Sequence, residues 1–281
     1  MQSVNSKTTP AQRKALDRRE ALCRIGGVGA ITVVAMQYRG LLASIMAGGA
    51  GTAASAADSV SAPVGARCAS IPEETAGPFP GDGSNRTSAD VANALLLPGI
   101  VRSDIRSSLA GAGGLARGVP LRLTLELVDT RSGCRPLSGH AIYLWHCDAL
   151  GRYSMYSQGA SAENYLRGVQ VSDASGRVSF VTIVPGCYGG RMPHMHFEVF
   201  RDLASAKGSA GKLRTSQLSF PLDMLGEAYA AGDYRDSAAN LADTSFARDP
   251  VFSDGHDLQM CTVSGSAATG YAAVMRVGVV G

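Results

Sequence analysis

Between residues 121 and 127 the chain alternates strictly between leucine and polar or charged side chains. The alternating residues are Leu121, Leu123, Leu125 and Leu127, separated by Arg122, Thr124 and Glu126. A period of two sends successive side chains to opposite faces of a strand, so this stretch predicts a strand with one buried face. Such a strand is stable only when that face packs against a second layer.

Further short apolar runs follow along the chain, separated by turn residues. They predict strands over 141–147, 178–184, 194–200, 218–220 and 272–280, with helix only around 224–231. Residues 81–118 are rich in glycine and serine and predict a long irregular connection with one short strand near Ile100. Many short strands joined by irregular connections are typical of packed sheets. The predicted fold is an all-β antiparallel β-sandwich with long irregular loops and little helix.

The first 56 residues differ in charge from the rest of the chain. Seven basic and two acidic residues give residues 1–56 a net charge of +5, so the +3 of the whole chain leaves −2 elsewhere. This excludes a broadly basic, nucleic-acid-binding surface on the folded part, because phosphate contacts need clustered cations. No nucleic-acid partner is expected.

Residues 1–56 also have the order of an export signal. Arg18 and Arg19 precede a mildly apolar stretch, and Ala54-Ser55-Ala56 is a small-residue cleavage site. The arginine pair favours a twin-arginine signal over an ordinary secretory one. Arg39 interrupts the apolar stretch, so no stable membrane span is expected after cleavage. The protein is expected to be exported, periplasmic or extracellular, with a flexible leader over 57–70 and a folded domain over 71–281.

The cysteines outside the predicted signal fit an oxidising compartment. They are Cys68, Cys134, Cys147, Cys187 and Cys261, an odd number that allows at most two bridges. Of the fifteen arrangements, we expect Cys134–Cys147 across a hairpin and Cys68–Cys261 between the ends of the domain. The sequence contains no Cys-x-x-Cys spacing, so no thiolate zinc site is expected.

Four side chains able to bind a metal lie within 44 residues of one another. His194 and His196 are two apart on a predicted strand, so both imidazoles share one face. Tyr188 precedes them through a short glycine loop, and Tyr153 follows the second predicted strand. Two tyrosinates and two neutral imidazoles neutralise two of the three charges of ferric iron. This donor set favours non-haem Fe(III) over zinc.

Four segments resemble the intradiol ring-cleavage dioxygenases. They are EETAGPFP, LWHCDALGRYS, YLRGVQVSDASGRVSF and TIVPGCYGGRMPHMHFEV. More narrowly, these segments are similar to the exported single-chain branch of the family, which is related to the protocatechuate and catechol enzymes. The resemblance runs from Cys68 to Val280 and is most specific over 140–200.

The resemblance implies a role for particular residues. The ferric ligands of the family fall on Tyr153, Tyr188, His194 and His196, its active-site arginine on Arg191, and its substrate-side glutamine on Gln217. The implied reaction uses O2 to cleave a catechol ring between its two hydroxylated carbons, giving a cis,cis-muconate-type product. In that reaction Tyr188 accepts a proton of the substrate, and Arg191 stabilises the developing negative charge.

The chain departs from the family pattern at two places. Cys187 stands where the family has a bulky residue, and only two residues separate Tyr188 from Arg191. Both positions border the substrate and bear on specificity, and a free Cys187 could also oxidise or bind the metal.

Other histidines, aromatic residues and acids have structural interpretations. We interpret His146 as a core histidine with its hydrogen bonds satisfied, or as one that supports a metal ligand. His140 and His256 are interpreted as solvated loop residues. Packing or pocket-wall positions are expected for Tyr143, Tyr156 and Tyr165, and Trp145 is expected in the core of the sandwich. Glu73 and Glu74 are adjacent on an extended segment and point to opposite faces, so they do not form an acid–base pair.

Two other functions remain open from the residues alone. One is a non-catalytic exported β-sandwich module that binds a metal or ligand, and the other is a hydrolase with zinc as Lewis acid. The expected partners are a catecholic small molecule and O2. A second copy of the chain, in a homo-oligomer, is a further candidate partner.

Overall fold

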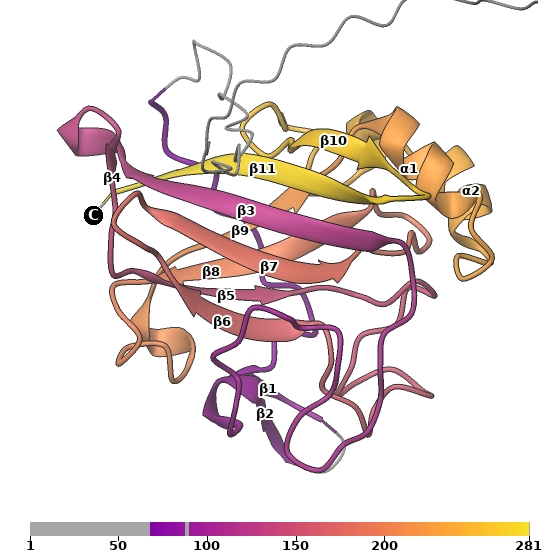
Figure 1. The fold of residues 1–281 in the computed structure, drawn as a ribbon, viewed down its shortest axis with the longest axis horizontal. Coiled ribbons are helices and arrows are strands. Elements are labelled where there is room, and N and C mark those ends of the chain that lie inside the picture. Colours follow the sequence, from indigo (N-terminus) through magenta and orange to yellow (C-terminus); the bar gives the residue numbers. More distant parts are fainter. Residues whose placement is uncertain (1–67, 88–89, 281) are drawn as a thin grey trace, which may run out of the picture. The chain divides into compact units, whose positions relative to one another are not determined.

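The computed structural model describes residues 68–87 and 90–280, which form two stacked sheets and the segments that cover them (Figure 1). The predicted export signal, residues 1–56, lies outside the described residues, as do residues 57–67 of the predicted leader. At the end of that leader, Cys68 forms a disulfide and Ser70 hydrogen-bonds Thr130.

One sheet has five strands. Its members are β3 (Pro120–Asp129), β4 (Arg135–Pro136), β7 (Arg177–Ile183), β10 (Thr262–Ser266) and β11 (Gly270–Val279). They run in the order β10-β11-β3-β4, with β7 also paired to β3. The long strand β3 therefore has neighbours on both sides. Its alternating pattern gives it one buried face, since its four leucines are buried and Arg122 is exposed.

The second sheet has four strands and carries the chemistry described below. Its order is β6 (Arg167–Val171), β5 (Ala141–Trp145), β8 (His194–Phe200) and β9 (Lys212–Ser219), all antiparallel. Met195, Phe197 and Val199 of β8 join the leucines of β3 in one apolar core. Because side chains alternate along a strand, His194 and His196 lie on the opposite face of β8, away from that core. The all-β sandwich is confirmed.

The structure corrects several predicted elements. Strands β3 and β11 pair in parallel, so the sandwich is not wholly antiparallel. Parallel neighbours need a long crossover, and here residues 130–269 separate the two strands. Residues 81–118 contain β1 (Asp82–Arg86) and β2 (Val91–Asn93), while the strand expected near Ile100 is a single bridge from Val101 to Val169. Strands β6 and β10 were also not predicted.

Helix is scarce in the described part of the chain. The predicted helix is α1 (Leu222–Tyr229), and an unpredicted second helix, α2 (Ser237–Ala242), follows it. Short 3-10 turns are η1 (Ala94–Leu96), η2 (Thr130–Ser132), η3 (Ser209–Gly211) and η4 (Phe246–Arg248). Within residues 68–87 and 90–280, no helix has the length and apolarity needed to cross a membrane.

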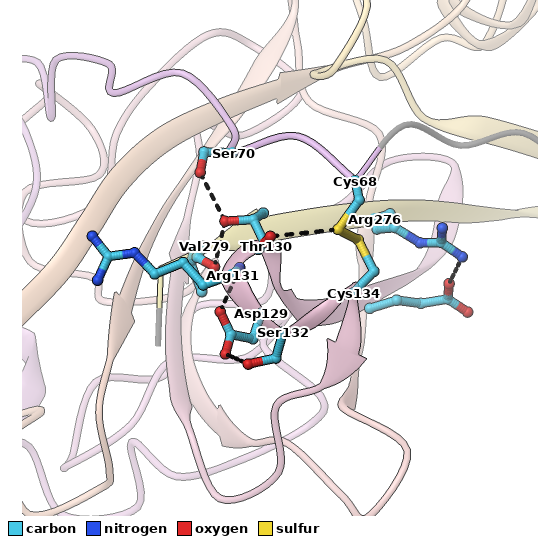
Figure 2. The surroundings of a disulfide bond; sticks show 10 residues. Cys68, Ser70, Asp129, Thr130, Arg131, Ser132, Cys134, Arg276 and Val279 are labelled. Atoms are coloured by element: carbon cyan, nitrogen blue, oxygen red, sulfur yellow. Dashed lines mark hydrogen bonds and ion pairs between the residues drawn. A yellow bond between two sulfur atoms is a disulfide. The ribbon is translucent and has the colours of Figure 1, made fainter.

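The disulfide joins a pair that we did not predict. Cys68 bonds to Cys134, with a Cα–Cα distance of 5.6 Å (Figure 2). Cys147, Cys187 and Cys261 are free and buried. Both predicted bridges, Cys134–Cys147 and Cys68–Cys261, are therefore wrong. The hairpin expected between Cys134 and Cys147 does not form, because β4 belongs to the five-stranded sheet and β5 to the other.

Candidate metal centre

Strand β8 presents two imidazoles on one face of the four-stranded sheet. His196 lies opposite Trp145 of β5 on one side and Gln217 of β9 on the other, and His194 lies opposite Ser219. Both imidazoles are almost completely buried. The period-two prediction for this pair is confirmed, since the two Nε2 atoms are 3.1 Å apart.

The two predicted tyrosines reach the same point from loops. Tyr153 Oη is 3.4 Å from His194 Nε2 and 3.2 Å from His196 Nε2. Tyr188 Oη is 3.1 Å from His194 Nε2 and 3.3 Å from Tyr153 Oη. Tyr188 and His196 form the remaining pair of these four residues, and no hydrogen bond or ring contact joins them. They therefore lie on opposite sides of the cluster.

This spacing fits a single cation. Two donors that bind one ion at about 2.1 Å, at angles of roughly 90–110°, lie about 3.0–3.4 Å apart. Five of the six donor pairs have separations of 3.1–3.4 Å. Four polar atoms thus converge as the ligands of one metal ion converge.

The neutral state of the two imidazoles fits metal ligands, whereas burial acts against ionisation of the two phenols. Burial lowers the pKa of His194 to about 3 and that of His196 well below its usual range, so both imidazoles are neutral. Burial raises the pKa of Tyr188 to about 12 and that of Tyr153 well above its usual range. The phenols therefore keep their protons unless a strong cation replaces them, and ferric iron is the biological cation that tyrosinate suits.

Neighbouring groups orient the imidazoles. His194 Nδ1 donates to the carbonyl of Met192 at 2.6 Å, which leaves Nε2 with its lone pair toward the cluster. The indole of Trp145 stacks on the ring of His196, with centroids 5.0 Å apart and planes 6° apart. Trp145 is buried, but it packs with Tyr143 and Tyr153 on the face of β5 that looks away from the core between the sheets, so its predicted place in the sandwich core is wrong. Its indole fixes the plane of a donor.

The turn after β7 places Tyr188 differently from Tyr153. Tyr153 is buried, whereas Tyr188 is half-buried and followed by two exposed glycines. The turn closes with a hydrogen bond from Arg191 N to Tyr188 O, and Gly190 has a φ of 81°, which favours glycine. Of the two phenols, that of Tyr188 therefore has more room to move.

The predicted arginine and glutamine meet beside the cluster. Arg191 Nη2 donates to Gln217 Oε1 at 2.6 Å, and Nη1 lies 3.5 Å from His194 Nε2. Arg191 Nε donates to Asp249 Oδ2 at 2.9 Å. Burial opposes ionisation of Asp249, but hydrogen bonds from the Met192 and Val251 backbone and the charge of Arg191 hold its pKa below the usual range. The result is an ion pair next to the donors, in which Asp249 is buried and Arg191 half-buried.

An extended stretch covers the centre; we call residues 75–80 the covering segment. Gln217 Nε2 donates to the carbonyl of Thr75 at 2.9 Å. Gly77 has a φ of 67°, and a Cβ at this position would lie 3.4 Å from Cε1 of His196. The ring of Phe79 contacts that of Tyr153, with centroids 5.2 Å apart. The backbone therefore passes directly over the donors.

Cys187 does not point at the cluster. Its thiol belongs to the apolar core and is 3.5 Å from the carbonyl of Arg191. Burial raises its pKa to about 12, so the metal-binding thiolate form is disfavoured. The expectation that Cys187 could bind the metal therefore has no support in the geometry.

The remaining residues named from the sequence lie apart from the donors. His146 is buried and bonds Thr182 through Nε2 at 2.7 Å, as expected of a core histidine. His140 and His256 are half-buried rather than fully solvated, and His256 stacks on Phe246.

Hydroxyl contacts place the other tyrosines. Tyr143, Tyr156 and Tyr165 bond Pro80 O, Asn85 Oδ1 and Asp148 Oδ2 respectively. These contacts agree with the packing and pocket-wall positions that we predicted.

Glu73 and Glu74 diverge as predicted. Glu73 pairs with Arg214, whereas Glu74 bonds the side chain of Gln259.

Asp249 and Arg167 were missed by the sequence reasoning. Asp249 is 58 residues from the arginine that it pairs with, and no local pattern marks it. Arg167 stands in a segment that carried the family resemblance, which was the available signal. A search of residues 68–87 and 90–280 finds no group of three His, Cys, Asp or Glu able to hold a metal; two of the four donors here are tyrosines.

The chain is similar to known dioxygenases in part of its sequence and in its fold. The sequence model of a family described as Dioxygenase matches residues 104–225. The structure resembles an intradiol ring-cleavage dioxygenase from Tetranychus urticae, with a TM-score of 0.57 and 21% identity over 75% of this chain and 94% of that one. A comparison with curated protein sequences finds no match.

Two further solved structures are similar at lower scores. One is the dioxygenase domain of a carbohydrate-binding fusion from Streptomyces sp. SirexAA-E, with a TM-score of 0.46 and 21% identity over 75% of this chain and 98% of that one. The other is 3-chlorocatechol 1,2-dioxygenase from Rhodococcus opacus, with a TM-score of 0.39 and 17% identity over 58% and 61%. The resemblance to intradiol ring-cleavage dioxygenases is confirmed.

Proposed function

We propose that this chain is an intradiol dioxygenase that uses non-haem Fe(III) and O2 to cleave catechol-type rings between their hydroxylated carbons. The products are of the cis,cis-muconate type. The observation that carries this proposal is the convergence of two phenols and two neutral imidazoles at one buried point. Tyr153, Tyr188, His194 and His196 would hold the iron.

The chemistry of the donor set supports iron over zinc. Tyrosinate is a hard anionic donor that ferric iron accepts readily, and structural and catalytic zinc sites use Cys, His, Asp and Glu. When bound, ferric iron withdraws electron density from a catecholate and makes its ring reactive toward O2. A hydrolytic zinc site has no use for two phenols.

Tyr188 would act as the base. Its half-buried phenol is on a turn with two exposed glycines, so it can leave the cluster without displacing the core. Its Oη would then accept a proton from a hydroxyl of the catechol. Tyr153 is buried and packed under Phe79, so it would remain in place.

Arg191 would stabilise negative charge that develops on the substrate. Its guanidinium is held by Asp249 and Gln217 and reaches to 3.5 Å from His194 Nε2. A donor fixed before reaction loses no energy to reorganisation, which makes its electrostatic effect large. Gln217 would hold Arg191 and, through Thr75, the covering segment.

Export of the protein is part of the proposal. A twin-arginine signal over 1–56 would place the domain outside the cytoplasm, and the Cys68–Cys134 bridge is compatible with an oxidising compartment. The substrate would then be a catechol available outside the cell.

The first test is the visible spectrum of the purified protein, with iron and zinc quantified, before and after anaerobic addition of catechol. We expect a broad tyrosinate-to-Fe(III) absorption band that shifts when catechol binds. Addition of O2 should then bleach the shifted band and release a muconate-type product.

Other results would favour the alternatives. A protein that stays colourless after ferric reconstitution would contradict the proposal and leave a zinc site or a non-catalytic binding module. A band that does not respond to catechol would support a metal-binding module without ring cleavage.

A further inference from the structure

Arg167 is a buried cation beside the metal-site loop. It is the first residue of β6, and its side chain is almost wholly excluded from solvent, with 1% exposed. A charged side chain is placed in such surroundings only when hydrogen bonds replace the water it loses. Its partners therefore show what it holds in place.

All five N–H groups of the guanidinium are used. Nη1 donates to the carbonyl of Pro80 at 2.7 Å, and Nη2 donates to that of Phe79 at 3.0 Å. Nε and Nη2 donate to the hydroxyl and the carbonyl of Ser154, at 3.1 and 2.9 Å. The fifth bond goes from Nη1 to Tyr143 Oη at 3.0 Å.

Two of these partners border Tyr153 from different parts of the chain. Ser154 follows Tyr153 directly in the sequence. Phe79 belongs to the covering segment, and its ring contacts the ring of Tyr153. One side chain thus joins the loop that carries a proposed ligand to the segment that packs against that ligand.

The loop needs such support because its backbone is strained. Met155 has a φ of 72°, a left-handed conformation that non-glycine residues rarely adopt. Strained residues persist where the surrounding contacts over-determine them, and they cluster at functional sites. Arg167 fixes Ser154 on one side of Met155, and its guanidinium lies 5.5 Å from the ring centre of Tyr156 on the other.

We propose that Arg167 is a positioning residue of the metal centre, which sets the phenol of Tyr153 by locking its loop to the covering segment. This inference rests on the proposed function, because it takes Tyr153 as an iron ligand. Arginine is suited to the task because its planar fork reaches partners in several fixed directions, which a lysine ammonium cannot do.

The test compares Arg167→Lys with Arg177→Lys in the full chain. Arg177 is the control, because it also begins a strand, β7, and its guanidinium bonds Glu126 through Nε and Nη2 without touching Arg167 or the Tyr153 loop. Fe(III) affinity is measured by competition with a chelator, and the tyrosinate band is measured per bound iron without substrate. Melting temperature is measured on the metal-free proteins.

We expect Arg167→Lys to bind Fe(III) about 10- to 100-fold more weakly and to give a weaker or shifted tyrosinate band. Arg177→Lys should keep the wild-type affinity and band, whatever its melting temperature. Ser154→Ala removes one of the five acceptors of Arg167, together with the hydrogen bond from the Ser154 hydroxyl to Tyr165 O, and should change affinity and band in the same direction by less. It keeps the test decisive if Arg167→Lys does not fold.

The outcomes separate the two proposals. If the wild-type protein gives no tyrosinate band, the proposed function fails, and this inference fails with it. If the wild-type band is present and both Arg167→Lys and Ser154→Ala keep wild-type affinity and band, this inference is overturned and the proposed function stands. An equal loss of affinity in Arg177→Lys would also overturn it, because the effect would then not be specific to the contacts of Arg167.

Discussion

Half-buried Arg191 and buried Asp249 form an ion pair at the edge of the candidate metal centre, with Nε 2.9 Å from Oδ2. The carboxylate is fully buried and also accepts hydrogen bonds from the backbone N–H groups of Met192, Val251 and Phe252. Among the described residues, Arg191 has the only guanidinium that hydrogen-bonds one of the four clustered side chains. The loop after η4, which contains Asp249, therefore fixes that guanidinium. Arg191 is held in place before any substrate binds.

Asp249→Asn should reduce both stability and turnover. The substitution leaves Arg191 without its counter-charge and places an amide against N–H groups, at a cost on the order of 3 kcal/mol. We expect kcat to fall about 10- to 100-fold with a smaller change in KM, because a displaced guanidinium affects the transition state most. Denaturant unfolding and steady-state kinetics measure the two effects.

Asp104→Asn is the control for that prediction. Asp104 pairs with Arg106 on the surface, where such pairs contribute only about 0–1 kcal/mol. Equal effects of Asp249→Asn and Asp104→Asn would show that the Arg191–Asp249 pair has no special role.

Tyr188→Phe and Tyr153→Phe should have different consequences. Without the Tyr188 hydroxyl the protein loses its proposed base, so ring cleavage should slow at least about 100-fold while iron is retained. Tyr153→Phe removes a buried donor that contacts three others, and it should lose most of the bound iron. Iron content and turnover are measured for each variant.

Tyr156→Phe is the matched control for the tyrosine variants. The Tyr156 hydroxyl bonds Gly81 N and Asn85 rather than the four donors, so turnover should stay close to wild type. A full rate of ring cleavage in Tyr188→Phe would contradict the base role.

The neutral state of His146 should make folding depend on pH. Burial lowers the pKa of His146 to about 4, below its usual value of about 6.5 in an unfolded chain. The unfolded chain therefore binds the proton first. The contribution of neutral His146 is complete above about pH 6.5 and is lost as pH falls toward 4, by about 3 kcal/mol.

His146→Gln isolates that contribution from other titrating groups. The stability difference between the metal-free wild type and the variant should be largest near pH 7 and shrink as pH falls to 4. Urea unfolding at a series of pH values measures it. A difference that does not change with pH would show that His146 is not held neutral.

Reduction of the disulfide should destabilise the domain. The bridge joins residues separated by 66 positions and ties the chain ahead of the covering segment to the turn after β3. Its loss should cost about 2–5 kcal/mol, mainly because the unfolded chain gains freedom. The melting temperature should therefore fall in reductant.

The double variant Cys68→Ser, Cys134→Ser is the control. Its melting temperature should be low from the start and unaffected by reductant. If reductant lowers the melting temperature of this variant equally, the effect does not come from the Cys68–Cys134 bridge.

The clustering of the four candidate ligands and the sandwich could be predicted because both depend on short-range patterns. Alternation identified the buried face of β3, and the same period placed His194 and His196 on one face of β8. Tyr153 and Tyr188 were found because the family resemblance marks the loops in which they stand. None of these inferences needed the partner strand to be known.

The disulfide, the ion pair of Arg191 and the contacts of Arg167 could not be predicted in this way. Each joins segments far apart in the chain, and many pairings satisfy the same local patterns. Cys134 lies near Cys68 rather than Cys147 because the chain changes sheets between β4 and β5.

By itself, the sequence determined the periodicity of the strands and the identity of the four donors, since those are properties of single elements. Only the tertiary structure decided that Asp249 holds Arg191, that Arg167 joins Ser154 to Phe79, and that β11 pairs in parallel with β3. The physical reason is that long-range contacts depend on how the sheets stack and which loops close, and no local period encodes that choice.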